Sequence, residues 1–170
     1  MCAQAFVCCA MPSSQILPLL YVGDEIAAIA PEVHEFKCVL NITEEVPKSA
    51  LLEEKVVFQR FPIFDVDGGE EEQAQMLSFF PTTCKMIQDN MELNRKVLVH
   101  CAEGKQRSCT VVTAYLIQSL GLTLVQAKAY LVAKHPQAFD FGSGLHFEQA
   151  LERWVRAVRL SSDSASLLKD

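Results

Sequence analysis

The sequence lacks the long apolar runs and the excess of positive charge that mark two large classes of protein. None of its apolar stretches approaches the roughly 18–20 residues that a membrane-spanning helix requires. Its 21 acidic residues outnumber its 15 basic residues, which gives a net charge of −6. This balance disfavours nucleic acid and anionic membranes as binding surfaces. We therefore expect no nucleic-acid partner and no stable membrane association.

The seven cysteines lack the regular pairing of a disulfide framework, since their number is odd and their spacing irregular. With no signal peptide apparent, this usage predicts a reducing compartment, the cytoplasm with the nucleus as an alternative. Cys2, Cys8 and Cys9 lie in an apolar, poorly patterned arm. A docked or loose arm is the favoured interpretation and palmitoylation the alternative, whereas Cys2 excludes myristoylation, which requires a glycine there.

A chain of 170 residues, half of them hydrophobic, suits one domain with an ample core. We divide it into an N-terminal arm (1–14), a folded domain (15–158) and a C-terminal tail (159–170). The tail is expected to be frayed from Ser161 onward. The sequence contains no internal repeat of the kind that builds a larger array. We expect a monomer.

The most informative stretch is His100-Cys101-Ala102-Glu103-Gly104-Lys105-Gln106-Arg107-Ser108. An apolar run, Val97 to Val99, precedes it, and another, Val111 to Leu120, follows. This order predicts a buried strand, a tight loop and a helix. A loop that leads into a helix N-terminus presents backbone N–H groups and the positive end of the helix dipole, so it attracts anions.

Cys101 and Arg107 stand at the two ends of that loop, with five residues between them. The guanidinium can hold two oxygens of a tetrahedral oxyanion while the sulfur lies beneath it. A cysteine beside a cation and a helix N-terminus loses its proton more readily and becomes a nucleophile. The stretch therefore predicts nucleophilic attack on phosphorus.

Other interpretations of this stretch explain it less well. Gly104-Lys105 does not belong to a Walker loop, because Val99 replaces the first glycine and Gln106 the hydroxyl residue after the lysine. A zinc site built from His100, Cys101 and Cys109 would lack paired-cysteine spacing. A buried strand-end cysteine would leave Gly104 and Arg107 without a role.

The remaining pattern predicts an α/β fold with its site at the carboxyl end of a strand. Strands are expected over Ile16–Val22, Cys38–Ile42 and Val56–Phe61. Helices are expected over Ser78–Met91 with Pro81 in the first turn, from Val111 to a stop at Gly121, from a capping box at Thr123 to His135, and over Phe147–Val158. His135 is interpreted as a charge partner at its helix C-terminus. Gly68-Gly69 and the acidic run Glu70 to Glu72 predict an exposed loop.

His-Cys-x-x-Gly-x-x-Arg-Ser resembles the signature of the cysteine-dependent protein tyrosine phosphatases. Leu19 to Asp24 and Cys38 to Ile42 are similar to segments of their dual-specificity branch, and the likeness covers about residues 15–158. It implies a central mixed sheet flanked by helices on both faces. It also implies hydrolysis of phosphotyrosine and phosphoserine or phosphothreonine in proteins through a cysteinyl-phosphate, without a metal or other cofactor.

The resemblance also assigns roles to residues. Cys101 would be the nucleophile and Arg107 the oxyanion ligand, with Ser108 bonded to the sulfur and His100 orienting the loop and helping to hold the thiolate. Residues 102–106 would form the phosphate-binding loop. Pro62 to Asp65 matches the family's Pro-Ile/Val-x-Asp pattern, which makes Asp65 the favoured general acid and Asp67 the alternative.

Two positions depart from the family's pattern. Gln106 replaces a small residue, and Glu103 places an acid beside the loop, which argues against strongly anionic substrates. Lys105 matches one lysine of the phosphoinositide-directed branch, but Ala102 stands where that branch has its other. Phosphoprotein is therefore the first substrate class, and lipid, glucan or RNA phosphate the second. A phosphoprotein-binding pseudophosphatase is the alternative from another functional class, although such relatives usually lose the cysteine or the arginine, and both are present here.

Overall fold

The computed structural model describes residues 13–30, 33, 35–64, 69–140 and 146–167. Its strands and helices follow one another in the order β1 (Ser13–Leu17), β2 (Leu20–Gly23), α1 (Glu25–Ile29), β3 (Cys38–Asn41), β4 (Val57–Arg60), α2 (Glu70–Glu92), β5 (Val97–His100), α3 (Arg107–Leu120), α4 (Leu124–Lys134) and α5 (Glu148–Leu167).

The strands form one mixed sheet in the order β1-β2-β5-β3-β4. Only β1 runs antiparallel to its neighbour; β2, β5, β3 and β4 are parallel. All four residues of β5 are buried, as expected for the central strand of a covered parallel sheet. Because parallel strands end at the same edge, Gly23, Asn41 and His100 lie side by side in register. The predicted site follows this edge.

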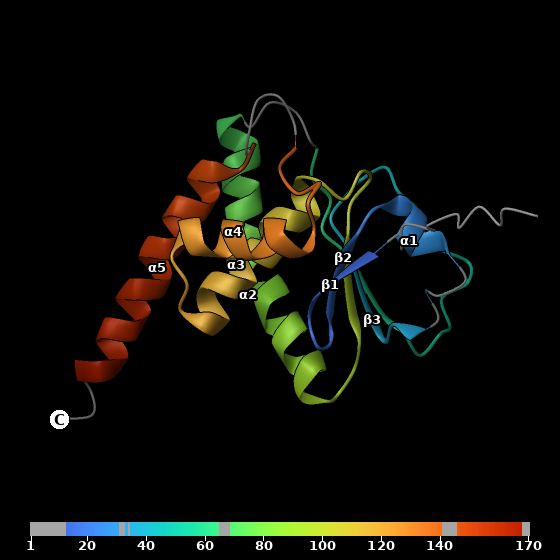
Figure 1. Cartoon of the computed structure of the whole chain (residues 1–170), viewed down its shortest axis with the longest axis horizontal. Helices are drawn as coiled ribbons and strands as arrows, with labels where there is room; N and C mark the ends of the chain where they lie inside the picture. Colours follow the sequence, from blue (N-terminus) through green and yellow to red (C-terminus); the bar gives the residue numbers. More distant parts are fainter. Residues whose placement is uncertain (1–12, 31–32, 34, 65–68, 141–145, 168–170) are drawn as a thin grey trace, which may run out of the picture.

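Helices cover both faces of the sheet, which confirms the predicted fold class. Helices α2 to α5 lie on one side and α1 on the other (Figure 1). Alternation along the strands divides the core accordingly: Val39 and Leu98 pack with Ala27 of α1, whereas Leu40 and Val99 face the larger cluster.

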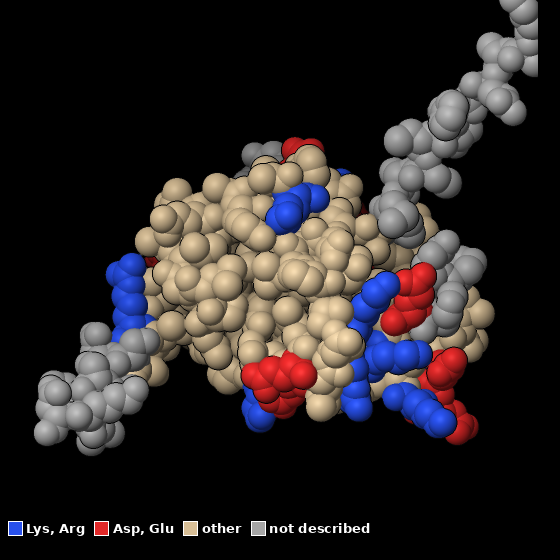
Figure 2. Space-filling model, turned by 60° about the horizontal axis from the view of Figure 1, so that its bottom comes forward, with Lys and Arg blue, Asp and Glu red and all other residues tan. Residues whose placement is uncertain are grey.

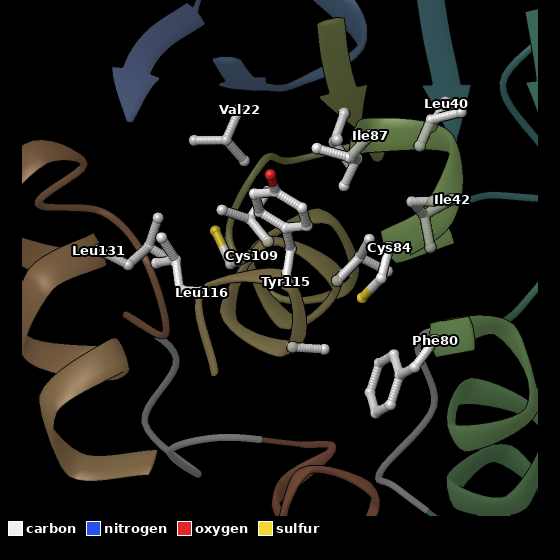
Figure 3. Close-up of a cluster of buried hydrophobic side chains, with 14 of the residues drawn as sticks. Val22, Leu40, Ile42, Phe80, Cys84, Ile87, Cys109, Tyr115, Leu116 and Leu131 are labelled. Atoms are coloured by element: carbon white, nitrogen blue, oxygen red, sulfur yellow. The ribbon is translucent and has the colours of Figure 1, made fainter. Parts of the chain in front are cut away.

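The larger cluster is centred on α3, whose side chains from Cys109 to Ile117 are all buried. Figure 3 shows the Tyr115 ring among apolar side chains from the sheet and from α2. Its hydroxyl lies 2.6 Å from Gln88 Oε1, so the buried ring retains a polar partner at its edge. This packing holds α3, and with it the start of the helix at Arg107, against the sheet.

The single strand predicted over Ile16–Val22 is wrong. The segment is a hairpin in which β1 and β2 are joined by a turn at Pro18-Leu19. Pro18 has no backbone N–H and favours a turn, so it interrupts the apolar run. The hairpin adds an antiparallel edge strand to the parallel sheet.

The prediction for α2 is also wrong at its start. Glu70, Glu71 and Glu72 form the first turn of the helix instead of an exposed loop, where their charges complement the positive end of the dipole. Pro81 therefore lies in the helix interior and not in its first turn. The ring lies on an exposed face, while Phe80 and Cys84 on either side are fully buried.

Other helix boundaries agree with the sequence signals. Helix α3 ends at Gly121, whose φ of 65° is readily adopted by glycine. Thr123 and Gln126 form the predicted capping box of α4. Helix α5 continues to Leu167, nine residues beyond the predicted end of the last helix at Val158 and into the segment assigned to the C-terminal tail.

No helix within the described ranges is long and apolar enough to cross a membrane. On the face shown in Figure 2, basic and acidic side chains lie beside one another instead of forming an area of one sign. Ion pairs of opposite charge are found on the exposed surface, such as Lys37–Glu53 at 3.8 Å and Lys96–Glu35 at 2.6 Å.

Candidate active site

The candidate site is the loop of residues 101–106, between the end of β5 and the start of α3. It begins at the edge where β2, β5 and β3 all end. The Cys101 N–H donates to the Gly23 carbonyl (3.4 Å), which continues the β2–β5 pairing by one residue. The position of Cys101 is thus fixed by the sheet, and the loop begins after it.

The Cys101 sulfur has two polar partners. The Gly104 N–H donates to Sγ at 3.2 Å, and the Ser108 hydroxyl lies 3.2 Å from Sγ. Ser108 belongs to the first turn of α3, so the sulfur also lies near the positive end of the helix dipole. Each of these contacts places a polar group against the sulfur.

The carbonyl groups of the loop are held on its outer side. Ala102 O accepts from the Glu25 N–H at 3.0 Å, and Lys105 O accepts from the Phe139 N–H at 2.9 Å. A trans peptide points its C=O and N–H in opposite directions. The amides of Glu103 and Gln106 therefore point away from Glu25 and Phe139, the orientation that we expect of an oxyanion-binding loop.

Arg107 is buried, and both terminal nitrogens of its guanidinium are oriented by hydrogen bonds. Nη1 donates to the Ile63 carbonyl at 3.0 Å, and Nη2 donates to Glu45 Oε1 at 2.8 Å. A guanidinium has five N–H groups. These two contacts consequently fix the plane of the guanidinium.

Glu45 is a site residue that the sequence analysis missed, because it lies in a polar, turn-rich segment without a motif. Asn41 and Arg60 anchor that segment by donating to Val46 O, each at 2.7 Å. Burial alone would raise the pKa of Glu45, but the hydrogen bond and charge of Arg107 lower it below the usual range. Glu45 is therefore ionised at neutral pH and forms an ion pair with Arg107.

His100 is fully buried at the end of β5. Burial lowers its pKa to about 4, helped by the nearby Arg60 and Arg107 charges. The ring is neutral at physiological pH, so it brings no positive charge to the sulfur. Its Nδ1 lies 3.4 Å from the Cys101 carbonyl, and this contact fits the predicted role of orienting the loop.

The two departures from the family's pattern have different environments. Gln106 is buried, and its Oε1 accepts from the His146 N–H at 3.2 Å, which ties the loop to the segment before α5. Glu103 is exposed and forms an ion pair with Lys105 at 3.3 Å. The acid beside the loop is thus partly neutralised by its neighbour.

Asp65 and Asp67 lie outside the described residues. The chain leading to them passes the site, since Ile63 O contacts Arg107 and Pro62 O accepts from Gln75 Nε2 at 2.8 Å. A pocket opens next to this segment, with an acidic rim and an exposed phenyl ring; it is lined by Glu44, Pro62, Phe64, Glu71, Glu72 and Gln75.

Three further cysteines in the described residues are buried. Burial raises the pKa of Cys38 and of Cys84 to about 12, and it raises that of Cys109 well above its usual value. These three remain thiols. In the part of the chain that the structure describes, no group of three or more His, Cys, Asp or Glu side chains is arranged to hold a metal ion.

A mixed sheet whose central strand ends in a cysteine, followed by a tight loop and a buried arginine at a helix N-terminus, defines the fold of the cysteine-dependent phosphatases. The family model "Dual specificity phosphatase, catalytic domain" matches residues 20–156. The chain belongs to this family.

Among its relatives, human dual specificity protein phosphatase 6 is 34% identical over 145 residues, which cover 81% of this chain and 36% of the relative. Dual specificity protein phosphatase Mpk3 of Drosophila melanogaster is 29% identical over 154 residues, covering 88% and 36%. The chain thus spans about a third of the length of these curated relatives.

Solved structures share the fold. Human DUSP28 has a TM-score of 0.74 at 24% identity and covers 87% of this chain and 95% of its own. A mouse dual specificity phosphatase complexed with zinc tungstate has a TM-score of 0.78 at 23% identity, covering 95% and 96%.

Proposed function

We propose that this chain hydrolyses phosphate monoesters of proteins, on tyrosine and on serine or threonine, through a cysteinyl-phosphate intermediate. The observation that carries the proposal is the environment of the Cys101 sulfur. It accepts from the Gly104 N–H and lies beside the Ser108 hydroxyl at the base of a loop whose carbonyls are held outward. Family membership supports the same chemistry.

In the first step, the Cys101 thiolate attacks phosphorus. The S–P bond forms as the bond from phosphorus to the leaving oxygen breaks. The inward amides and Arg107 bind the non-bridging oxygens, where charge is concentrated in the transition state. Asp65, or Asp67 as the alternative, donates its proton to the departing phenolate or alkoxide.

In the second step, water attacks the phosphocysteine. The carboxylate that lost its proton now removes one from the water, and the P–O bond forms as the S–P bond breaks. Ser108 donates to the sulfur as its negative charge returns, making the thiolate a better leaving group. Phosphate and the free thiolate remain, so protons and electron pairs balance without a metal or redox partner.

The acidic rim favours protein substrates over phosphoinositides and RNA. Glu44 and Glu71 line the pocket beside the segment that leads to Asp65 and Asp67, and Phe64 exposes 56% of its surface there. A polyanionic lipid headgroup or nucleic acid would meet like charges at this rim. A peptide with basic and apolar residues near its phosphate would meet complementary groups.

Purified protein tested with an activated aryl phosphate provides the first experiment. We expect hydrolysis by the wild type, while Cys101→Ser loses at least about 10²-fold in kcat yet still binds inorganic tungstate, because the amides and Arg107 persist. A wild-type protein that binds tungstate without turnover would instead be a phosphoprotein-binding pseudophosphatase. Turnover by Cys101→Ser close to the wild-type rate would exclude Cys101 as nucleophile.

A further inference from the structure

His135 occupies a position that the sequence analysis interpreted wrongly. The residue caps the C-terminus of α4, but its ring is buried and points away from the helix. Nε2 lies 2.8 Å from the Gly104 carbonyl in the phosphate loop, and Nδ1 lies 2.8 Å from Ser14 Oγ in β1. The ring thus connects the edge hairpin to the loop.

The partners of the ring define where its proton resides. A carbonyl oxygen only accepts, so Nε2 carries the hydrogen and donates to Gly104 O. In the neutral ring, Nδ1 then accepts from the Ser14 hydroxyl. Burial lowers the pKa of His135 below its usual 6.5, although the Gly104 carbonyl and Asp24 oppose this shift. The neutral ring therefore predominates at physiological pH, and a charge-partner role at the helix C-terminus is excluded.

The Gly104 carbonyl accepts two hydrogen bonds. Besides His135, the Cys109 thiol donates to it at 3.1 Å, and a thiol is the weaker donor of the two. The planar peptide between Gly104 and Lys105 then directs the Lys105 N–H to the opposite side. Gly104 itself directs its own N–H to the Cys101 sulfur. Two successive amides thus depend on how Gly104 is oriented.

Gly104 has a backbone conformation and a close contact that favour glycine at this position. Its φ is 68°, and a Cβ there would lie 3.0 Å from the Gly23 carbonyl carbon. The loop presses against β2 on one side, and His135 closes the other. Releasing the His135 contact would let the Gly104–Lys105 peptide rotate, since a single weak thiol donor would remain.

We propose that His135 is a positioning residue that fixes the anion-binding conformation of the phosphate loop through the Gly104 carbonyl. The inference rests on the proposed phosphatase function for its catalytic consequence. For its structural content it rests on two hydrogen bonds: the one that His135 donates to the Gly104 carbonyl and the one that it accepts from the Ser14 hydroxyl. His135 touches neither the sulfur nor the expected place of the substrate, so it acts through the loop.

The test compares His135→Gln with His135→Asn and His135→Phe. A glutamine amide reaches about as far as Nε2 and donates to the same carbonyl, whereas asparagine is too short and phenylalanine has no donor. We expect His135→Gln to keep tungstate affinity within about threefold of wild type, measured by calorimetry. Asparagine and phenylalanine should weaken it about tenfold, with a similar fall in kcat/KM, as expected for one lost hydrogen bond near a charged ligand.

Thermal unfolding identifies variants that are merely less stable, and binding is measured well below the lowest Tm. Equal tungstate affinity in His135→Gln and His135→Asn would overturn the inference, because the Nε2 donor would then not matter. If His135→Phe fails to fold, the Gln–Asn pair still decides. A wild type that binds tungstate with this dependence but hydrolyses no phosphate monoester would refute the proposed function alone.

Discussion

Removing the Glu45 carboxylate tests whether Arg107 must be held in place to bind a phosphate. Glu45→Ala deletes the partner at 2.8 Å from Nη2 and leaves the Ile63 carbonyl on Nη1. The Arg107 side chain is only 5% exposed, whereas that of Glu45 is 47% exposed. A fully exposed pair would contribute about 0.2–1 kcal/mol, and a buried hydrogen bond to a charged group about 1.5–3 kcal/mol. We therefore expect a loss of about 1 kcal/mol in stability after discounting for solvent.

The same value sets the expected effect on catalysis. About 1 kcal/mol corresponds to roughly a fivefold change in an equilibrium constant. If the pair presents the guanidinium to the anion, Glu45→Ala should lower kcat/KM by roughly that factor. Glu53→Ala is the matched control, because that carboxylate is exposed and pairs with Lys37, which precedes β3 at the edge of the sheet opposite the site. An unchanged or higher kcat/KM in Glu45→Ala would show that Glu45 competes with the anion for Arg107, which would refute this reasoning.

The pH dependence of the pair has a definite sign. The folded pKa of Glu45 lies below its usual 4.5, so its contribution to stability is complete above that value. It is lost as the pH falls through the folded pKa. The difference in unfolding free energy between wild type and Glu45→Gln should therefore be constant from pH 6 to 8 and shrink below about pH 4.5. Denaturant unfolding at several pH values measures it.

Three further substitutions or treatments test the proposed chemistry. Arg107→Lys keeps one charge but loses the planar pair of donors, so kcat should fall by about 10²-fold or more in steady-state assays; near-normal kcat would make Arg107 a structural cation only. Mild peroxide should inactivate the enzyme through Cys101, and added thiol should restore activity. Burial raises the pKa of Cys109, so this thiol should be slow to form a disulfide with oxidised Cys101. Rapid appearance of a Cys101–Cys109 disulfide by mass spectrometry would contradict this expectation. Asp65→Asn should slow hydrolysis of a phosphotyrosine peptide far more than hydrolysis of an activated aryl phosphate, whereas Asp67→Asn should leave both rates near those of wild type. If Asp67→Asn instead shows the selective loss and Asp65→Asn does not, Asp67 is the acid.

The sequence predicted the centre of this molecule better than its periphery. The strand before Cys101 and the helix after Arg107 could be predicted because an apolar run marks each of them and Gly121 marks the end of the helix. The start of α2 could not, because three glutamates suit an exposed loop as well as a helix N-terminus. Pro81 then suggested a false first turn. Packing of apolar side chains on both sides of the proline outweighed its local preference.

The candidate site shows the same division. Cys101, Ser108 and Arg107 are close in sequence, so a motif contains them all. Glu45 lies 62 residues before its partner Arg107, and His135 lies 31 residues after its partner Gly104. Neither segment carries a pattern that distinguishes a buried contact from a solvated charge. Only the order of the strands and the docking of α4 bring them to the loop.

The contact between Arg107 and the Ile63 carbonyl has a thermodynamic consequence. Ile63 lies two residues before Asp65, so the guanidinium joins the anion site to the segment that carries the proposed acid. If anion binding alters the strength of that hydrogen bond, it must also shift the conformational equilibrium of the backbone at Ile63. Linkage is reciprocal: whatever shifts the backbone at Ile63 must then change the affinity for phosphate by the same factor. A partner protein that binds only the surface around Phe64 would thereby change the affinity for phosphate without contacting the cysteine.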